Sequence, residues 1–592
     1  YLYNNNIYYL FNIDTIEKIS SNKKIRYNLK QRIINHINNI KHSSTYLKLF
    51  ILGDNTNLNK DILDNYRLLG ISHLFAVSGM HISILTVILL KLLKKIKISE
   101  FYRYILVIIF ILFYMFLTDY SASILRAAIF FILLSINKYY YFNIKTINLL
   151  LLTLIINIFI NPYIIYNVGF QFSYIISLYL ILFQDLITKQ NNYFSKLLMV
   201  SSIAFLTSFP IVIYNFFQIN LLSIVYNLLF VPLVSLIIFP LSLIVFIFPF
   251  LDKLLYIFTK LMEYLSFQLI KINSTIILSK PNLFIVLIYY LLITYVLYSI
   301  KKGKKYPIVY LLLFILFHYF SPFFNPNTYL TMIDVGQGDS ILIRLSHNRG
   351  NILIDTGGDF NYRENWQIKN KEYSLGCDTL IPYFKSLGIR KIDYLIITHG
   401  HIDHMGEANN IINNFKVEKV IFNKAFIANE EKNIIYNLSN QNIPHYFYGA
   451  GDNLTINKQT LYFLNPTNKE KDLNDNSLVI YTELNNNKVL LMGDASTTIE
   501  NRLLARYKIN DLFILKVSHH GSISGTSETL LDYSKPKYAL VSVGLNNKFK
   551  HPHKEVLDRL KERGIKTYIT SRDGSIQYIF SKRAVTVKVC PA

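Results

Sequence analysis

The first half of this sequence has very few acidic residues. Only five occur between residues 71 and 320: Glu100, Asp119, Asp185, Asp252 and Glu263. The same region contains long apolar runs, among them residues 104–117 and 221–250. A helix needs roughly 20 mainly apolar residues to cross a lipid bilayer. So little negative charge over this length excludes an ordinary soluble domain and predicts a polytopic, all-α membrane region.

Cysteine is also scarce. The 592 residues contain two, Cys377 and Cys590, which excludes a disulfide framework. A single bridge between them would require an oxidising compartment. The sequence starts with Tyr1 and shows no signal-peptide pattern, so we expect a fragment or a chain from which something has been removed.

The shortage of acids leaves a net charge of +24. A strongly basic chain favours a polyanion or an anionic membrane surface as its partner. The sequence is also rich in Asn, Ile, Lys and Tyr. A bias towards AT-rich codons would produce the same enrichment, so both explanations of the charge stay open.

The chain divides into three regions by composition: a polar segment (1–70), an apolar region (71–320) and a mixed region (325–592). We expect about eight to ten membrane spans. They fall at 71–90, 102–118, 121–137, 147–160, 164–184, 197–216, 220–250 (broken by proline), 254–271, 283–299 and 307–320.

The short loops of the apolar region differ in charge. Lysines concentrate in residues 91–97, 137–145 and 301–305. Cytoplasmic loops carry an excess of basic residues, so these three are expected in the cytoplasm. The last span, 307–320, then carries everything after it to the outer side of the membrane.

The pattern changes near Tyr329. Short β-rich runs now end in polar, glycine-containing turns, as in "YLTMIDVGQGDSILIRL", "NILIDTG", "KIDYLIITHG", "KVLLMGD" and "LFILKVSHHGS". Strands whose carboxyl ends carry His, Asp and Gly predict an α/β sandwich with a site along one edge.

The string "HGHIDHMGE" (399–407) has the spacing of a metal site. His399 and His401 can face one ion, and Asp403 and His404 can face a second. Imidazole and carboxylate ligands suit Zn, Mn or Fe, and paired ions activate water and polarise a phosphoryl or acyl oxygen. One isolated histidine would more simply belong to a turn, but the grouping makes that explanation improbable. Further ligand candidates follow later strands: Asp494, His519 and His520.

These strings resemble the metallo-β-lactamase superfamily, which implies a four-layered αββα sandwich, usually with two metal ions. The resemblance assigns Asp355 of "LIDTGG", Asp403 and Asp494 to the catalytic centre. Between Asp403 and Asp494 the superfamily usually adds another histidine. Residues 473–481 offer Asp475, Asn476 and Ser477 there instead. We therefore expect a weaker first ion, which favours Mn over tightly held Zn. Alignment on the following glycine favours His520 over His519.

Several polar residues lie at apparent membrane depth. They are candidates for a channel lining: His73, Ser78, His81, Arg126 and Gln171. Polar groups at that depth normally face a bundle interior or an aqueous path. Hydrogen bonding between helices is the simpler explanation for a single Ser. Arg126 favours a functional role, because a buried charge must be paired or hydrated.

The strings "RLLGISHLFAVSGMHISIL", "SILRAAIFF" and "YNVGFQFSYIIS", followed by "MIDVGQGDSILI" and "LKVSHHGS", resemble ComEC-type DNA-internalisation (competence) channels. The resemblance runs from about residue 45 to 580 across both regions. It interprets the segment 1–70 as the tail of a missing OB-fold-like domain. It also implies a multi-pass protein of the bacterial inner membrane that passes one DNA strand inward while its extracytoplasmic nuclease domain degrades the other.

For this function we expect four residues to contact phosphate: Lys516, Lys550, His551 and His553. "KHPHKEV" is equally consistent with a proline-opened helix start. The expected partners are double- and single-stranded DNA, membrane lipid, a separate DNA receptor and a cytoplasmic motor, since the sequence shows no nucleotide-binding P-loop. Two alternatives remain: a channel whose second domain only guides DNA, and a membrane-anchored metallohydrolase of another phosphodiester.

Overall fold

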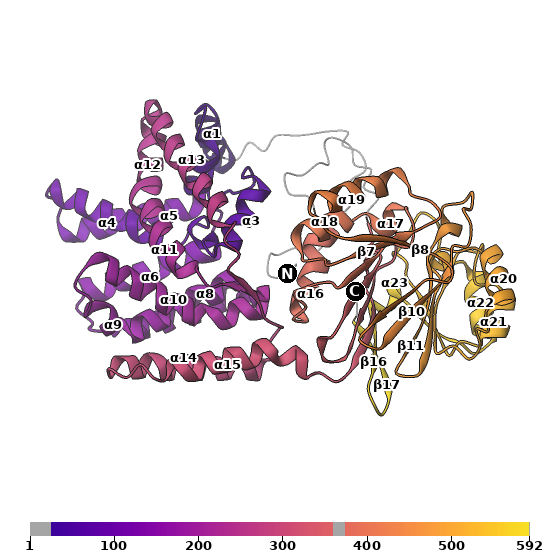
Figure 1. Cartoon of the computed structure of the whole chain (residues 1–592). Helices are drawn as coiled ribbons and strands as arrows, with labels where there is room; N and C mark the ends of the chain where they lie inside the picture. The colour runs from indigo at the N-terminus through magenta and orange to yellow at the C-terminus, as the bar shows by residue number, and fades with distance from the viewer. Residues whose placement is uncertain (1–24, 359–372, 591–592) are drawn as a thin grey trace. The chain divides into compact units, whose positions relative to one another are not determined.

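The computed structural model describes residues 25–358 and 373–590 of the chain (Figure 1). The chain forms two compact units, which meet in sequence between Ile315 and Leu316. The first unit is built from helices, and the second is built around two β-sheets.

The helices of the first unit follow one another with short connections. They are α1 (Ile25–Asn38), α2 (Ser44–Leu47), α3 (Lys60–Leu68), α4 (Gly79–Lys95), α5 (Glu100–Leu117), α6 (Ala122–Tyr139), α7 (Thr146–Ile160), α8 (Val168–Leu182), α9 (Gln184–Thr188), α10 (Tyr193–Phe216), α11 (Ser223–Pro232), α12 (Phe239–Ile247), α13 (Asp252–Leu269), α14 (Leu283–Lys301) and α15 (Ile308–Phe320). Two short strands, β1 (Gln218–Asn220) and β2 (Thr275–Ile277), pair antiparallel.

Among the described residues, five helical segments are long and apolar enough to cross a membrane: Ser72–Lys95, Glu100–Leu117, Tyr193–Phe216, Ser223–Ile247 and Leu283–Lys301. Three shorter apolar helices accompany them: Thr146–Ile160, Val168–Leu182 and Ile308–Phe324. These helices fit a membrane protein. The expected spans at 121–137 and 254–271 are not among these helices. The helix at the second position, α13, carries four charged residues: Asp252, Lys253, Lys260 and Glu263.

The segment 220–250 is not broken by its prolines as expected. It forms one continuous helical stretch in which the π-helical turn η5 (Leu233–Ile238) joins α11 to α12. A proline inside a helix removes one backbone hydrogen bond, and a wider turn accommodates that loss. The stretch therefore stays helical through Pro232 and Pro240.

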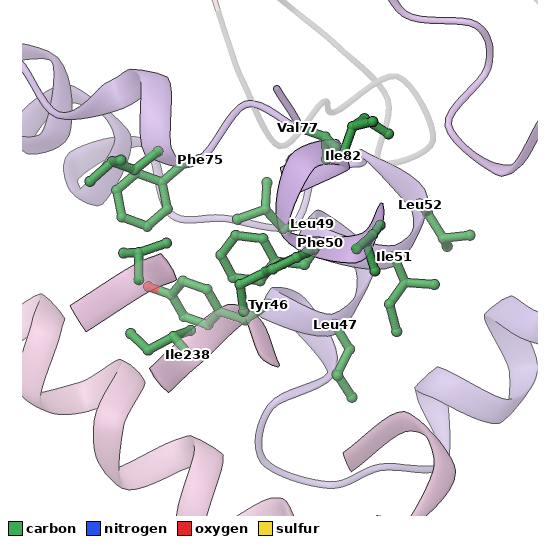
Figure 2. Packing of buried hydrophobic residues seen from close by; sticks show 14 of the residues in the cluster. Tyr46, Leu47, Leu49, Phe50, Ile51, Leu52, Phe75, Val77, Ile82 and Ile238 are labelled. Atoms are coloured by element: carbon green, nitrogen blue, oxygen red, sulfur yellow. The ribbon is translucent and has the colours of Figure 1, made fainter. Parts of the chain in front are cut away.

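The described part of the polar segment 1–70 packs into the helical unit. Tyr46 and Phe50 are buried in the same core as Ile82 of α4 and Ile238 of η5, as Figure 2 shows. Asp252, at the start of α13, accepts backbone N–H bonds from residues 42 and 43 at 2.9 and 3.0 Å. Residues 37–69 thus contribute to the core of this unit.

In the second unit, two sheets pack against each other. One has eight strands in the order β17-β16-β3-β4-β5-β6-β7-β8, and the other has seven in the order β15-β14-β13-β12-β11-β10-β9. The first contains β3 (Thr328–Met332), β4 (Ile341–Arg344), β5 (Asn351–Ile354), β6 (Tyr394–Ile396), β7 (Val420–Asn423), β8 (His445–Tyr448), β16 (Ser575–Phe580) and β17 (Val585–Cys590). The second contains β9 (Asn453–Ile456), β10 (Gln459–Asn465), β11 (Val479–Leu484), β12 (Asn487–Leu491), β13 (Ile514–Lys516), β14 (Tyr538–Val541) and β15 (Lys566–Ile569).

Helices cover the outer face of each sheet (Figure 1). Those beside the eight-stranded sheet are α16 (Ile381–Ser386), α17 (Ile402–Met405), α18 (Ala408–Asn414) and α19 (Asn429–Asn440). Those beside the seven-stranded sheet are α20 (Thr497–Arg506), α21 (Glu528–Ser534) and α22 (Lys554–Glu562), and a single turn, α23 (Thr570–Asp573), precedes β16. This is the expected αββα sandwich.

The alternation of side chains along each strand builds the core. In β13, Ile514 packs between the two sheets, whereas Leu515 packs under the outer helices. Strands β5 and β6 are parallel, as are β12 and β13, so the carboxyl ends of each pair meet at one edge of their sheet. The polar turns that follow these strands are brought together there.

Candidate metal centre

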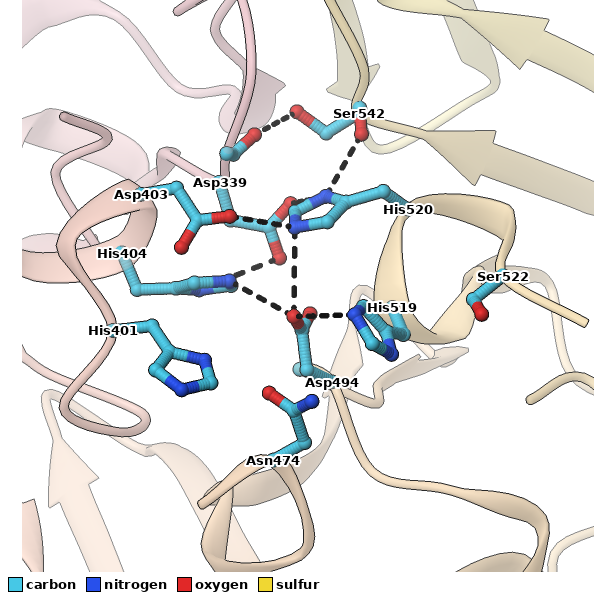
Figure 3. A network of polar contacts seen from close by, with 12 residues as sticks. Asp339, His401, Asp403, His404, Asn474, Asp494, His519, His520, Ser522 and Ser542 are labelled. Atoms are coloured by element: carbon cyan, nitrogen blue, oxygen red, sulfur yellow. Dashed lines mark hydrogen bonds and ion pairs between the residues drawn. The ribbon is translucent and has the colours of Figure 1, made fainter. Parts of the chain in front are cut away.

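The candidate site is built from turns that follow strands. Asp355 follows β5, His399 lies shortly after β6, Asp494 follows β12 and His520 follows β13. His401 precedes α17, whose four residues contain Asp403 and His404. The sequence pattern therefore delivers its ligand candidates to one place (Figure 3).

Each of the three most buried imidazoles of this site is held by an outer partner through Nδ1. Asp355 Oδ2 lies 2.8 Å from Nδ1 of His404, and the Ser542 carbonyl lies 2.9 Å from Nδ1 of His520. The Ser477 hydroxyl lies 3.2 Å from Nδ1 of His399. Partners of this kind fix the tautomer and ring orientation of metal-binding histidines. The Nε2 atoms are left to face the centre of the site.

The inward atoms converge on Asp494. Its Oδ2 lies 3.3 Å from His404 Nε2, 3.5 Å from His520 Nε2 and 4.0 Å from His399 Nε2. Asp403 Oδ2 approaches His520 Nε2 to 3.4 Å. Ligand atoms of Asp403, His404 and His520 all lie within 4.8 Å of one another, as do those of His399, His404 and Asp494. Asp494 therefore lies between two groups of donors.

The electrostatics of the cluster favour a cation. Burial opposes a charged His404, but Asp494, Asp355 and Asp403 outweigh it and raise the pKa of this imidazole well above its ordinary value. For His520, burial is likewise outweighed, mainly by Asp494 and Asp339, and its pKa is raised. A negative potential that favours a proton on these rings also favours a metal ion.

The donor set fits divalent metal. Nε2 of His404, Nε2 of His520 and Oδ1 of Asp494 are buried without a hydrogen-bond partner, although buried polar groups are normally bonded. A bound ion would satisfy all three. Neutral imidazoles and carboxylates are the ligands that zinc and manganese accept in proteins. Together with Asp403, these residues would supply four donors to one ion.

A second ion would have fewer donors. His399 Nε2 and His401 Nδ1 approach each other to 3.2 Å. Asn476 lies in the segment where the superfamily usually has a further histidine. Its side chain bonds to the backbone of Glu470 and Asp472 and so holds its own loop. Figure 3 instead shows Asn474 beside His401 and Asp494, and its buried Oδ1 has no hydrogen-bond partner. Asn474 is thus a candidate ligand that the sequence analysis missed.

Asp339 is a second missed residue. It follows β3 in "GQGDS", and its Oδ1 lies 3.5 Å from His520 Nδ1. Gly338 has φ +116°, and a Cβ there would lie 2.0 Å from the carbonyl oxygen of Asp403. Glycine therefore lets this turn touch the turn that carries the ligands. An acidic residue among glycines after the first strand was the available signal.

Lys516 differs from the expectation that it contacts phosphate. Its side chain is fully buried, forms an ion pair with Asp339 and donates to the Gly493 carbonyl at 2.9 Å. The cause is strand alternation, since Lys516 lies on the same inward face as Ile514. Burial lowers the pKa of Lys516, but Asp339 and Asp494 outweigh it and raise the pKa above the ordinary value. A buried ammonium thus balances two carboxylates of the site.

Asp355 differs in position from its predicted catalytic role, whereas the histidine pair follows the preference for His520. Both carboxylate oxygens of Asp355 are occupied by Thr398, at 2.8 and 2.7 Å, and one also faces His404. Asp355 therefore orients the His404 ring. Of the histidine pair, His520 is buried in the cluster, whereas the His519 side chain is 28% exposed with Nε2 3.8 Å from Asp494. The structure favours His520 as the ligand.

Of the other expected phosphate contacts, His551 lies beside His519. The His551 ring centroid lies 5.6 Å from that of His519 and 4.9 Å from that of His553. Burial and the neighbouring imidazoles lower the pKa of His551 to about 4, so it is neutral at physiological pH. Lys550 is exposed, and His553 precedes α22. Both explanations of "KHPHKEV" are thus compatible with the fold.

In the helical unit, three of the five channel candidates lie together at the start of α4, and the other two do not. Ser78 and His81 bond to each other at the start of α4, through the Ser78 N–H and His81 Nδ1 at 3.1 Å. Arg126 is buried against the same helix end. His73 is exposed, and Gln171 donates to the carbonyl of Ile165 at 2.9 Å.

Comparison with known proteins identifies both regions. A family model described as "Competence protein" matches residues 50–303, and one for the "Metallo-beta-lactamase superfamily" matches residues 333–432. ComE operon protein 3 of Bacillus subtilis is 29% identical over 614 aligned residues, covering 100% of this chain and 79% of that protein.

Two further relatives match a smaller part. Competence protein ComA of Neisseria gonorrhoeae is 27% identical over 257 residues, covering 42% of this chain and 32% of that protein. Recombination protein 2 of Haemophilus influenzae is 30% identical over 257 residues, covering 43% of this chain and 29% of that protein. The chain is therefore similar to the competence proteins over its whole length, and its C-terminal unit has the metallo-β-lactamase fold.

Proposed function

We propose that this chain is a DNA-uptake channel of the bacterial inner membrane whose C-terminal unit is a metal-dependent nuclease. In this proposal, single-stranded DNA passes through the helical unit. The C-terminal unit lies outside the cytoplasm and hydrolyses the strand that is not transported. The names of the relatives and the apolar helices support the uptake role.

One observation carries the nuclease proposal: buried donor atoms converge on Asp494 while outer partners hold their rings. His404 and His520 present unpartnered Nε2 atoms, and Asp494 presents an unpartnered Oδ1. A site that only guided DNA would not need this arrangement, because unsatisfied buried groups each destabilise the fold by about 1–3 kcal/mol.

The position of each residue indicates its role in this proposal. Asp403, His404, His520 and Asp494 would hold one divalent ion, Mn or Zn, and His399, His401 and Asp494 would hold a second. Divalent metal at such a site supplies Lewis-acid polarisation of a phosphoryl group and activation of water. Asp355 keeps the His404 ring in place. The half-buried rings of His519 and His551 can hydrogen-bond the phosphate as it enters.

The orientation and the partners belong to the same proposal. Basic residues end α4, α6 and α14, among them Lys94, Lys138 and Lys301. The excess of basic residues in cytoplasmic loops supports placing these ends inside. A separate receptor would bring double-stranded DNA to the outer face, and a cytoplasmic motor would draw in the single strand.

Cleavage by the purified full chain tests the nuclease. The protein in maltoside micelles is incubated with single- and double-stranded DNA in Mn²⁺, Zn²⁺ or EDTA, and bound metal is measured in parallel. The matched variants are Asp403→Asn, in the cluster, and Asp558→Asn, exposed on α22. Mutating an outer partner of a metal ligand typically lowers metal affinity or activity about 10- to 100-fold. We expect Asp403→Asn, which changes a ligand itself, to cause a larger loss. Asp558→Asn should match the wild type.

The possible outcomes separate the alternatives. Metal-dependent cleavage that Asp403→Asn abolishes supports the nuclease. Metal binding without cleavage of either DNA overturns it. In that case, DNA binding by the same preparation would indicate a guide domain, and hydrolysis of another phosphodiester would indicate a different substrate.

A further inference from the structure

Arg126 of α6 is a buried cation without an acidic partner. The residue is 8% exposed, and among the described residues no carboxylate forms an ion pair with it. Its Nη1 donates to the Ser177 hydroxyl at a long 3.4 Å, and its Nε has no hydrogen-bond partner. The Tyr174 ring centroid lies 5.8 Å from the guanidinium carbon. These contacts leave the positive charge uncompensated.

The guanidinium lies against the amino end of α4. A Cβ built on Gly79, the first residue of that helix, would lie 2.7 Å from Arg126 Nη2. The absence of a side chain at Gly79 is what allows this approach. A capping box formed by Ser78 and His81 occupies two N–H groups at this helix end. The other N–H groups of the first turn have no acceptor within the helix, and a helix amino end carries about half a positive charge. Two positive groups thus meet at one point.

Two positive groups without an anion repel each other. A buried charge that lacks a partner destabilises a protein by several kcal/mol. An oxyanion beside both groups would accept from the guanidinium and from backbone N–H groups together. Helix amino ends bind phosphates in this way, and the fork of donors on arginine matches phosphate oxygens.

We propose that Arg126 and the amino end of α4 bind a phosphodiester group of a DNA strand. This inference rests on the proposed uptake function and names a contact for the strand in the helical unit. A lipid headgroup offers the same phosphate chemistry but lies at the outer surface of a helix bundle. Arg126 instead lies among Gly79 of α4 and Ser177 of α8, inside the unit.

Local hydrogen exchange tests the site in the full chain. The protein in phosphate-free maltoside micelles with EDTA is mixed with the oligonucleotide dT12, and exchange of the first-turn amides of α4 is followed. We expect at least about fivefold slower exchange there, a modest gain for a charge-assisted contact. Arg126→Gln should abolish the protection. Lys138→Gln, which removes an exposed charge from the same helix, should retain it.

Three further arms identify the ligand and exclude a structural role. dT12 with a neutral methylphosphonate backbone should give no protection. Inorganic phosphate and dioctanoyl phosphatidylglycerol replace dT12 in separate samples, and protection by either but not by dT12 overturns the DNA assignment. Without ligand, Arg126→Gln should melt no lower than the wild type, because it removes an unpaired buried charge. Arg126→Lys should keep part of the protection.

The outcomes are distinct from those of the nuclease test. No protection of wild-type α4 by dT12, or equal protection in Arg126→Gln, overturns this site whatever the variants' stability. Cleavage in Mn²⁺ by the same preparation without protection at α4 refutes this site alone. Protection without cleavage refutes the nuclease and leaves this site standing.

Discussion

Replacing Lys516 with methionine would remove a buried ammonium from between two carboxylates. The Nζ atom forms an ion pair with Asp339, lies 3.6 Å from Asp494 Oδ1 and donates to the Gly493 carbonyl at 2.9 Å. Methionine nearly fills the same volume and adapts to irregular space. The change therefore removes charge and hydrogen bonds far more than packing.

The magnitude follows from burial. Removing one partner of a buried ion pair destabilises a protein by about 3–5 kcal/mol, because the other charge is left uncompensated. Lys516 is fully buried, and Asp339 and Asp494 are nearly so. We therefore expect Lys516→Met to lose about 3–5 kcal/mol of unfolding free energy in EDTA. Divalent metal should restore part of this loss, about 2.7 kcal/mol at a concentration 100 times its Kd.

Hydrogen exchange of the β12 and β13 amides in the full chain measures this free energy without isolating the unit. Lys508→Met, which alters an exposed lysine of the same unit, is the control and should change stability by less than about 0.5 kcal/mol. If Lys516→Met were as stable as this control in EDTA, the buried ammonium would not be balancing the carboxylates.

Two further changes address the surroundings of the site. Glu431 is fully buried, and burial raises its pKa to about 7. The stability from its neutral form is complete below the unfolded pKa near 4.5 and is lost as the pH rises towards 7. Glu431→Gln should therefore raise the unfolding free energy at pH 8 by up to roughly 3 kcal/mol, which slower exchange of the β7 amides would report. At pH 4 the substitution should change this free energy little. Parallel pH profiles for the two proteins would contradict this. Asp355→Asn should reduce Mn²⁺ affinity about 10- to 100-fold in a chelator competition, since it releases the His404 ring. Unchanged affinity would show that Asp355 does not position this ligand.

Much of the architecture follows from local pattern. Apolar segments of helical length predicted α4, α5, α10 and α14, and alternating runs that end in polar turns predicted the strands. The expected break within 220–250 was wrong, because the turn around Pro232 widens and keeps the helix continuous. Proline signals a lost hydrogen bond, but the chain around it decides whether the helix ends.

The site was predictable where ligands share one short string. His399, His401, Asp403 and His404 lie within six residues, so their spacing alone indicated metal chemistry. The pairing of that string with Asp494 required the strands to lie side by side. Parallel strands bring such turns to the same edge of a sheet.

The sequence by itself therefore determined the two classes of structure and the central ligand string. Only the tertiary structure decided that Asp339 pairs with a buried Lys516, that Asn474 and not Asn476 lies beside the cluster, and that Arg126 lies against Gly79. These contacts join residues that are distant in sequence or separated by a loop. The periodicity of a sequence indicates on which face of a helix or strand a side chain lies. The packing of sheets and helices determines which charged residue that side chain contacts.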